Sequence, residues 1–160
     1  MNKAAGFTLI EVLIAVVLLA GGLLGLAALQ AASLKNNQSA YNRSQATQLA
    51  YDMADRIRAN PVESTDRANA IPSTLTASVY VAAATPAPQA SCDSSPGCTP
   101  ALMAQNDRAK WLADIASNLP SGTAPPIAVD AATRVFTITI SWDDNHFGAV
   151  DTSFTMSFQI

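Results

Sequence analysis

Residues 7–29 read FTLIEVLIAVVLLAGGLLGLAAL, an apolar run of 23 residues in which only Thr8 and Glu11 are polar. As a helix rising about 1.5 Å per residue, this run would be roughly 35 Å long. The hydrocarbon core of a bilayer is about 30 Å thick, so such a helix can cross it. The run therefore predicts a single membrane-spanning helix near the start of the sequence.

A secretory signal peptide is an alternative interpretation of this run. Signal peptides have a shorter apolar stretch, of about 7 to 15 residues, and end at small residues in an Ala-x-Ala pattern. No Ala-x-Ala occurs from Ala15 to Ala32. Cleavage by ordinary signal peptidase would leave a new terminus between Gln30 and Leu34. Lys3 is the only charged residue before the run, so charge bias says little about orientation.

Glu11 is the most informative residue of the run, because an unpaired carboxylate in an apolar helix costs several kcal/mol. One interpretation places Glu11 near enough to the membrane surface for its carboxylate to reach water. The other supplies a cation. If the chain is cut between Gly6 and Phe7, the new α-amine lies at the same end of a neighbouring helix. Glu11 would then favour subunits that bring this charge, and would set the register of staggered helices.

The segment GFTLIE, from Gly6 to Glu11, with the apolar run behind it resembles the class III signal of type IV prepilins and type II secretion pseudopilins. The resemblance implies that residues 1–6 are a leader, which a prepilin peptidase removes by cutting after Gly6 on the cytoplasmic side. Phe7 would become the methylated N-terminus, and removal of six of the 160 residues would leave 154. Glu11 would pair with the amino terminus of an adjacent subunit during assembly.

Three further segments narrow the resemblance: GLAALQ at 25–30, NNQSAY at 36–41 and AYDMADRIRANP at 50–61. They resemble the minor pilins called PilV, or type IV pilus modification proteins. The match covers residues 1–61 well and the rest of the chain loosely. The implied partners are prepilin peptidase, other minor and major pilins, the inner-membrane assembly machinery and inner-membrane lipid. The implied location is the bacterial inner membrane, crossed once with the C-terminal domain in the periplasm, and the pilus at the cell surface after assembly.

The overall composition averages two different parts. The chain is 49% hydrophobic and 13% charged, but residues 30–160 are polar and rich in Ala, Ser, Thr and Pro. These residues hold eight Lys and Arg against eleven Asp and Glu, a net charge of −3. They offer no basic field that would attract nucleic acid. The length fits one modest domain and excludes a multidomain enzyme.

The helix is expected to continue beyond the membrane. Residues 30–60 contain no proline or glycine, and Pro61 ends the helix because the residue before a proline is pushed away from helical geometry. The pair Asp52 and Arg56 is expected on the solvated side. We therefore expect residues 7–29 in lipid and residues 30–60 as the periplasmic half of one helix. Its second half carries an apolar stripe at helical spacing, formed by Ala46, Leu49, Ala50, Met53 and Ile57.

Residues 61–160 are expected to form a small globular domain. Its first part, residues 61–101, reads as loop with at most one short strand at 78–82. Cys92 and Cys98 are the only cysteines, and a turn sequence separates them, so a disulfide is expected in an oxidising periplasm. The alternatives are a redox-active pair, which normally has C-x-x-C spacing, and a metal site, which needs more ligands than two thiols.

The rest of this domain has clearer periodicity. Residues 107–119 read as an amphipathic helix with Asn106 or Asp107 as its cap. Two runs, residues 136–142 and 154–160, alternate apolar and polar side chains and are expected to be strands. A shorter strand is expected before them, at residues 127–129. We expect an antiparallel sheet whose apolar face packs on the stripe of the long helix. This is a pilin-like α+β architecture, which the family resemblance also implies.

Asp143, Asp144, Asn145 and His146 form the only cluster of candidate metal ligands, at a turn between two predicted strands. Asp and Asn also concentrate at turns for local hydrogen bonding, and the spacing does not match an EF-hand loop. We therefore predict no metal and no cofactor. His146 is the sole histidine, and no G-x-S-x-G or nucleotide-binding glycine loop is present. No catalytic residue is predicted, and we expect no enzyme.

The leading hypothesis is a minor pilin, stored in the membrane and processed after Gly6, that primes or joins a type IV pilus through its N-terminal helix. One alternative is a minor pseudopilin of a type II secretion system, which shares the features up to about Leu29. Residues 30–61 favour the pilus. An alternative of another class is a single-pass membrane-anchored periplasmic binding module, in which the GFTLIE match is accidental.

Overall fold

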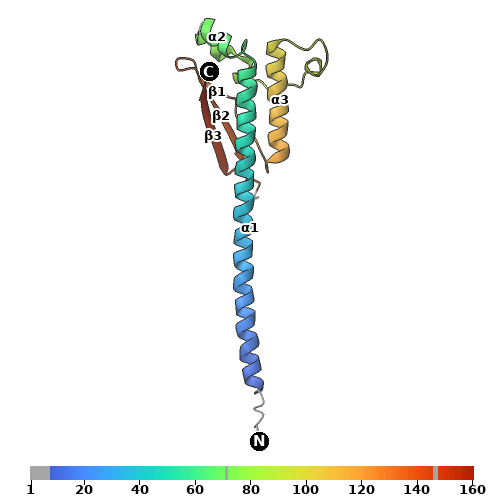
Figure 1. Cartoon of the computed structure of the whole chain (residues 1–160), viewed down its shortest axis with the longest axis vertical. Helices are drawn as coiled ribbons and strands as arrows, with labels where there is room; N and C mark the ends of the chain where they lie inside the picture. Colours follow the sequence, from blue (N-terminus) through green and yellow to red (C-terminus); the bar gives the residue numbers. More distant parts are fainter. Residues whose placement is uncertain (1–7, 71, 146–147) are drawn as a thin grey trace. The chain divides into compact units, whose positions relative to one another are not determined.

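The computed structural model describes most of the chain, namely residues 8–70, 72–145 and 148–160. The chain divides into two compact units, Met1–Ala40 and Tyr41–Ile160. Helix α1, Leu9–Ala59, contributes to both units (Figure 1). Its 51 residues confirm the prediction of one long helix.

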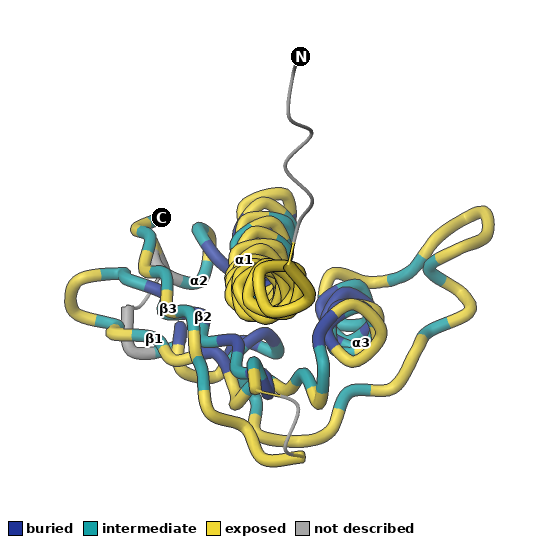
Figure 2. The backbone as a smooth tube through the Cα atoms, turned by 90° about the horizontal axis from the view of Figure 1, so that it is seen from below, coloured by how far each residue is buried: buried dark blue, intermediate teal, exposed yellow. Residues whose placement is uncertain are grey.

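The first unit consists of the part of α1 up to Ala40. The helix begins after Thr8, whose carbonyl and hydroxyl oxygens accept the Glu11 N–H at 3.1 and 3.4 Å. Threonine is favoured here because its side chain satisfies an N–H that lacks a helical partner. Every side chain of residues 8–38 is exposed, and this part of α1 is yellow in Figure 2. A window of 18 residues has a mean hydropathy of 2.8, so α1 is long and apolar enough to cross a membrane.

The second unit packs an antiparallel sheet on α1. Strands β1 (Ala128–Asp130), β2 (Val135–Trp142) and β3 (Thr152–Gln159) lie in the order β1-β2-β3. One hydrophobic cluster joins the buried face of β2 to a stripe on α1. The β2 residues are Phe136, Ile138, Ile140 and Trp142. The α1 residues are Ala46, Ala50, Met53, Ala54 and Ile57. The predicted α+β fold is thus confirmed.

Strand β3 pairs with β2 along its full length and is held by α1 as well. Phe158 of β3 stacks on Phe136 of β2, with ring centroids 5.6 Å apart. The Arg58 guanidinium of α1 lies 4.6 Å from the centroid of the Phe158 ring. Arg58 also pairs with Asp55 at 3.1 Å. A cation over an aromatic face adds to the burial of the ring, so Arg58 covers the outer side of the core.

Helix α3, Pro100–Asn118, begins seven residues before the predicted start at 107. Thr99 is its N-cap, since its hydroxyl accepts the Leu102 N–H at 3.3 Å. Pro100 was expected to belong to the loop, but proline suits the first turn of a helix because the missing N–H has no partner there. The predicted caps, Asn106 and Asp107, instead lie in the middle of α3, and both residues are buried.

The described residues between α1 and α3 contain no strand, so the short strand that the sequence allowed at 78–82 does not form. The segment forms instead helix α2 (Thr65–Ala70) and the 3₁₀ helices η1 (Pro72–Ala77), η2 (Val79–Val81) and η3 (Ala90–Asp93). At η2 the Ser78 hydroxyl accepts the Tyr80 N–H at 3.3 Å. The Glu63 carboxylate accepts the Val79 N–H at 2.9 Å. Side chains therefore satisfy the N–H groups that a strand would have paired with a neighbour.

Glu63 is only 2% exposed and ties η2 to α2. Arg67 donates to its two carboxylate oxygens, from Nη2 at 2.7 Å and from Nε at 3.1 Å. Burial by itself would raise the pKa of the Glu63 carboxyl. The hydrogen bonds from Arg67, the Val79 N–H and Ser78 outweigh this effect, so the pKa lies below its ordinary value.

Glu63 should therefore make the fold pH-sensitive in the acid range. A carboxyl whose pKa is lower in the folded state stabilises the fold above its unfolded pKa, and the contribution is lost as the pH falls through the folded pKa. Glu63→Gln should lower the free energy of unfolding by about 1–3 kcal/mol near neutral pH. The difference from wild type should shrink below about pH 4.

Urea unfolding of the full chain in detergent, followed by tryptophan fluorescence at neutral and acid pH, measures this difference. Asp55→Asn is the matched control, because its side chain is 76% exposed and its pair with Arg58 lies at the surface. It should change stability by less than about 1 kcal/mol. An effect of Glu63→Gln that is equal at both pH values would contradict the prediction.

The core contact between β2 and α1 can be tested on neighbouring residues of one strand. Ile138 is fully buried, so Ile138→Ala should cost about 2–5 kcal/mol in urea unfolding. Thr139 lies on the opposite face, where its hydroxyl is 3.2 Å from that of Thr155. Thr139→Ala should cost less than about 1 kcal/mol. Similar losses for the two variants would show that the buried face of β2 does not carry the fold.

Candidate functional site

The predicted processing site precedes α1 in the sequence. Gly6 and Phe7 fall outside the described residues. Glu11 lies in the first turn of α1 with an exposed side chain. It occupies the same region of the helix surface as Val12, Ala15 and other apolar residues, so its carboxylate projects from an apolar surface.

The first unit presents a continuous apolar surface around the helix. Large side chains on all sides are exposed; Leu18 is 71% and Leu24 72% exposed. Soluble monomers rarely leave so much contiguous apolar surface uncovered, and such surfaces mark contacts with lipid or protein. This part of α1 is therefore built to be covered by other molecules.

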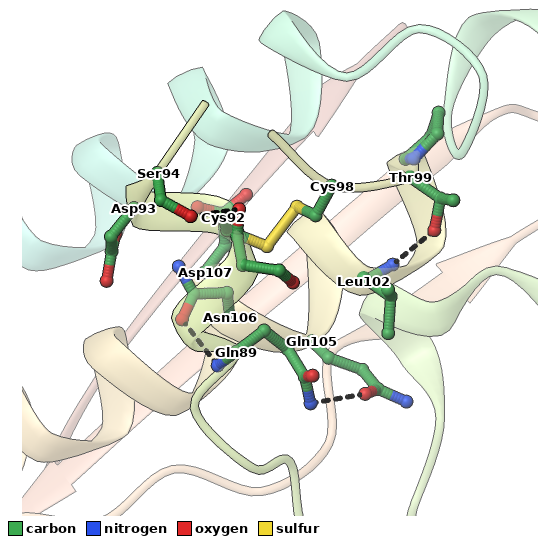
Figure 3. The surroundings of a disulfide bond; sticks show 12 residues. Gln89, Cys92, Asp93, Ser94, Cys98, Thr99, Leu102, Gln105, Asn106 and Asp107 are labelled. Atoms are coloured by element: carbon green, nitrogen blue, oxygen red, sulfur yellow. Dashed lines mark hydrogen bonds between the residues drawn. A yellow bond between two sulfur atoms is a disulfide. The ribbon is translucent and has the colours of Figure 1, made fainter. Parts of the chain in front are cut away.

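The disulfide expected between Cys92 and Cys98 is present, with an S–S distance of 2.05 Å and a Cα–Cα distance of 4.7 Å. Gln89, three residues before Cys92, ties this loop to α3 (Figure 3). Its N–H donates to Asn106 Oδ1 at 3.0 Å, and its side chain donates to Gln105 Oε1 at 3.1 Å. The disulfide thus closes a small surface loop that is held on the side of α3.

The predicted ligand cluster at residues 143–146 is only partly described, because His146 lies outside the described residues. Asp144 has a structural role. Its Oδ1 accepts hydrogen bonds at 3.1 Å from Trp142 Nε1 and from Asn42 Nδ2 of α1. The turn after β2 is thereby anchored to the helix.

The neighbouring carboxylates take part in the same turn. Asp151 accepts the Asp144 N–H at 2.8 Å, and this bond is the main reason that the pKa of Asp151 lies below its ordinary value. Asp143 accepts the Gly148 N–H. Within residues 8–70, 72–145 and 148–160, no group of three His, Cys, Asp or Glu side chains could hold a metal ion.

Sequence reasoning missed a polar cluster that joins α1, η2 and α3. Arg56 pairs with Asp52 at 2.8 Å, as its spacing predicted, but it also reaches Asp107 of α3 at 3.3 Å. The Tyr80 hydroxyl of η2 donates to Asp107 at 2.7 Å. Burial favours a lower pKa for Arg56, but its bonds to Asp52 and Asp107 raise it. Burial and the Asp107 carboxylate raise the pKa of Tyr80. Apart from the pair Asp52 and Arg56, no local signal reveals this cluster, since Tyr80 and Asp107 are far from that pair in sequence.

Two family models match the chain, and together they account for residues 1–109. Residues 1–27 match the prokaryotic N-terminal methylation motif. Residues 28–109, about half of the chain, match the family described as type IV pilin Tt1218. No curated protein and no solved structure matches the chain. The long apolar helix, the small antiparallel sheet and these matches agree, and the chain belongs to the Tt1218-like family of type IV pilins.

Proposed function

We propose that this pilin is a minor pilin of the PilV type, which primes or joins a type IV pilus. The observation that carries the proposal is the exposed apolar surface of α1, on a chain that also matches the N-terminal methylation motif. Lipid covers this surface before assembly, and the helices of other pilins cover it afterwards. The function is assembly rather than catalysis.

In the proposed life cycle the chain has four parts. Residues 1–6 are the leader that prepilin peptidase removes, and Phe7 is then methylated. Residues 7–29 anchor the subunit in the inner membrane and later pack in the fibre. Residues 30–60 continue the helix in the periplasm, and residues 61–160 form the domain displayed outside. The disulfide between Cys92 and Cys98 suits this oxidising location.

Glu11 supplies the register of assembly in this proposal. Its carboxylate is costly to leave unpaired among apolar helices, because a buried charge without a partner is strongly destabilising. The α-amine of Phe7 on an adjacent subunit compensates it at one axial offset only. Apolar packing provides most of the attraction, and the charge pair selects the stagger.

The PilV assignment rests on sequence segments within residues 1–61, and its rival is a minor pseudopilin of a type II secretion system. The two differ in the machine that takes up the subunit. Mass spectrometry of sheared pili separates them. A minor pilin should be present at a small fraction of the major subunit, whereas a pseudopilin should be missing from pili and its deletion should impair secretion.

Processing can be read from the N-terminus of the purified chain. The wild-type protein should begin at Phe7 and carry one extra methyl group. Gly6→Val should retain residues 1–6, because a branched side chain replaces the small residue at the cut. Intact-mass and N-terminal peptide analysis of membrane fractions provide the measurement. A wild-type chain that keeps Met1 would refute the processing step.

The register role of Glu11 predicts a defect in assembly without a defect in membrane insertion. Glu11→Ala and Glu11→Gln should both reach the membrane at wild-type levels, yet their amount in sheared pili should fall about tenfold or more, since one missing buried charge pair is worth at least that factor. Quantitative immunoblots of membrane and pilus fractions measure both quantities.

Asp66→Asn is the matched control, because it removes one carboxylate from an exposed position on α2. It should enter pili normally. If both Glu11 variants enter pili as well as wild type does, Glu11 does not set the register.

A further inference from the structure

Helix α3 carries a buried cation that the pilin function leaves unexplained. Arg108 is 6% exposed. Its Nη1 donates to the Val79 carbonyl at 3.1 Å, and its Nη2 donates to the Ala84 carbonyl at 3.3 Å. These two bonds hold residues 79–84 on α3. They satisfy two of the N–H groups of the guanidinium but do not neutralise its charge, because both acceptors are uncharged.

Arg108 differs in this respect from Arg56, the other partly buried arginine that contacts α3. Arg56 is balanced by the carboxylates of Asp52 and Asp107. Among the residues that the structure describes, no carboxylate pairs with Arg108. In keeping with this contrast, burial lowers the pKa of Arg108. Buried charges are normally paired, so an unbalanced one calls for a partner from outside.

A cavity of about 140 Å³ lies beside Arg108. Helix α3 forms one wall with Arg108, Trp111 and Leu112, and residues 83–86 and 124–127 form the others. Most of the lining is apolar, through alanine, proline and isoleucine side chains, and Arg108 is the only charged residue among the described residues that line it. Since a water molecule takes about 30 Å³ in the liquid, the cavity has room for a group of roughly four non-hydrogen atoms.

We propose that this cavity binds a short carboxylate, with Arg108 as the group that recognises it. One guanidinium balances one negative charge, which favours a monoanion over a phosphate dianion. The remaining N–H groups of a guanidinium suit the two oxygens of a carboxylate. The apolar walls suit a stem of one or two carbons. A free organic acid or an acidic side chain of another protein would meet this description.

Acetate is the probe that tests the site, with acetamide as the neutral molecule of the same shape. In NMR spectra of the full chain in detergent, acetate should shift the signals of Trp111 and Leu112 in a saturable manner. Acetamide, and chloride at equal ionic strength, should not. The same titration with a blocked aspartate, which has amides at both ends, tests whether an acidic side chain can bind. Shifts from this compound identify an acidic side chain as a fitting occupant, and their absence restricts the site to free acids.

Arg108→Gln should weaken acetate binding about tenfold or more, because glutamine can still donate to a carbonyl but carries no charge. Lys110→Gln removes the same charge from α3 outside the cavity, where Lys110 pairs with Asp93, and should bind acetate as wild type does. Ala84→Leu fills the cavity from an exposed position and should abolish binding while Arg108 remains.

Ala84→Leu decides the question if Arg108→Gln does not fold, and the Ile138 methyl signal in the core reports folding in each variant. Equal shifts from acetate and chloride would overturn the proposal. Unchanged acetate binding in Ala84→Leu or in a folded Arg108→Gln would also overturn it. None of these outcomes depends on pilus assembly, so the site and the proposed function can fail separately.

Discussion

Burial of one stripe of α1 against β2 is the contact on which the rest of the second unit depends. Three of the five buried residues in the stripe are alanines, at positions 46, 50 and 54. Phe136 and Trp142 of β2 belong to the same buried cluster as these alanines. Helix α3 covers the same cluster, and Trp111 fixes it to α1 by donating to the Leu49 carbonyl at 2.8 Å. Apolar burial thus draws three elements together, and one directed bond orients them.

Polar groups complete this arrangement at the ends of the core. Asp107 of α3 accepts bonds from Arg56 of α1 and from Tyr80 of η2, so one carboxylate joins three elements. Asn42 near the other end of the buried stripe binds Asp144 in the turn after β2. Such contacts add little net free energy when made, but a buried partner left alone is costly. They therefore exclude other packings of α3 and the turn.

The two parts of helix α1 differ in how far the chain itself covers their apolar side chains. Up to residue 38 every side chain is exposed although most are apolar, whereas from Asn42 onward one stripe is covered by the chain itself. An apolar helix that its own chain leaves bare requires lipid or other helices around it. In the proposed function, lipid before assembly and the helices of other pilins afterwards would cover this same surface.

The sequence by itself determined the long helix, the buried stripe, the two main strands and the disulfide pairing. Each is a local pattern: a helical or alternating period, or two cysteines across a short turn. The start of α3 at Pro100 also has a local signal, the Thr99 cap followed by proline, which the predicted start at 107 overlooked. Tertiary structure alone decided the 3₁₀ turn at 78–82 and the cluster around Asp107. It also decided that Arg108 is buried beside a cavity, with no carboxylate partner among the residues that the structure describes. These features depend on partners distant in sequence, such as Glu63 for Val79 and the Val79 carbonyl for Arg108, and such partners become visible only when the chain is folded.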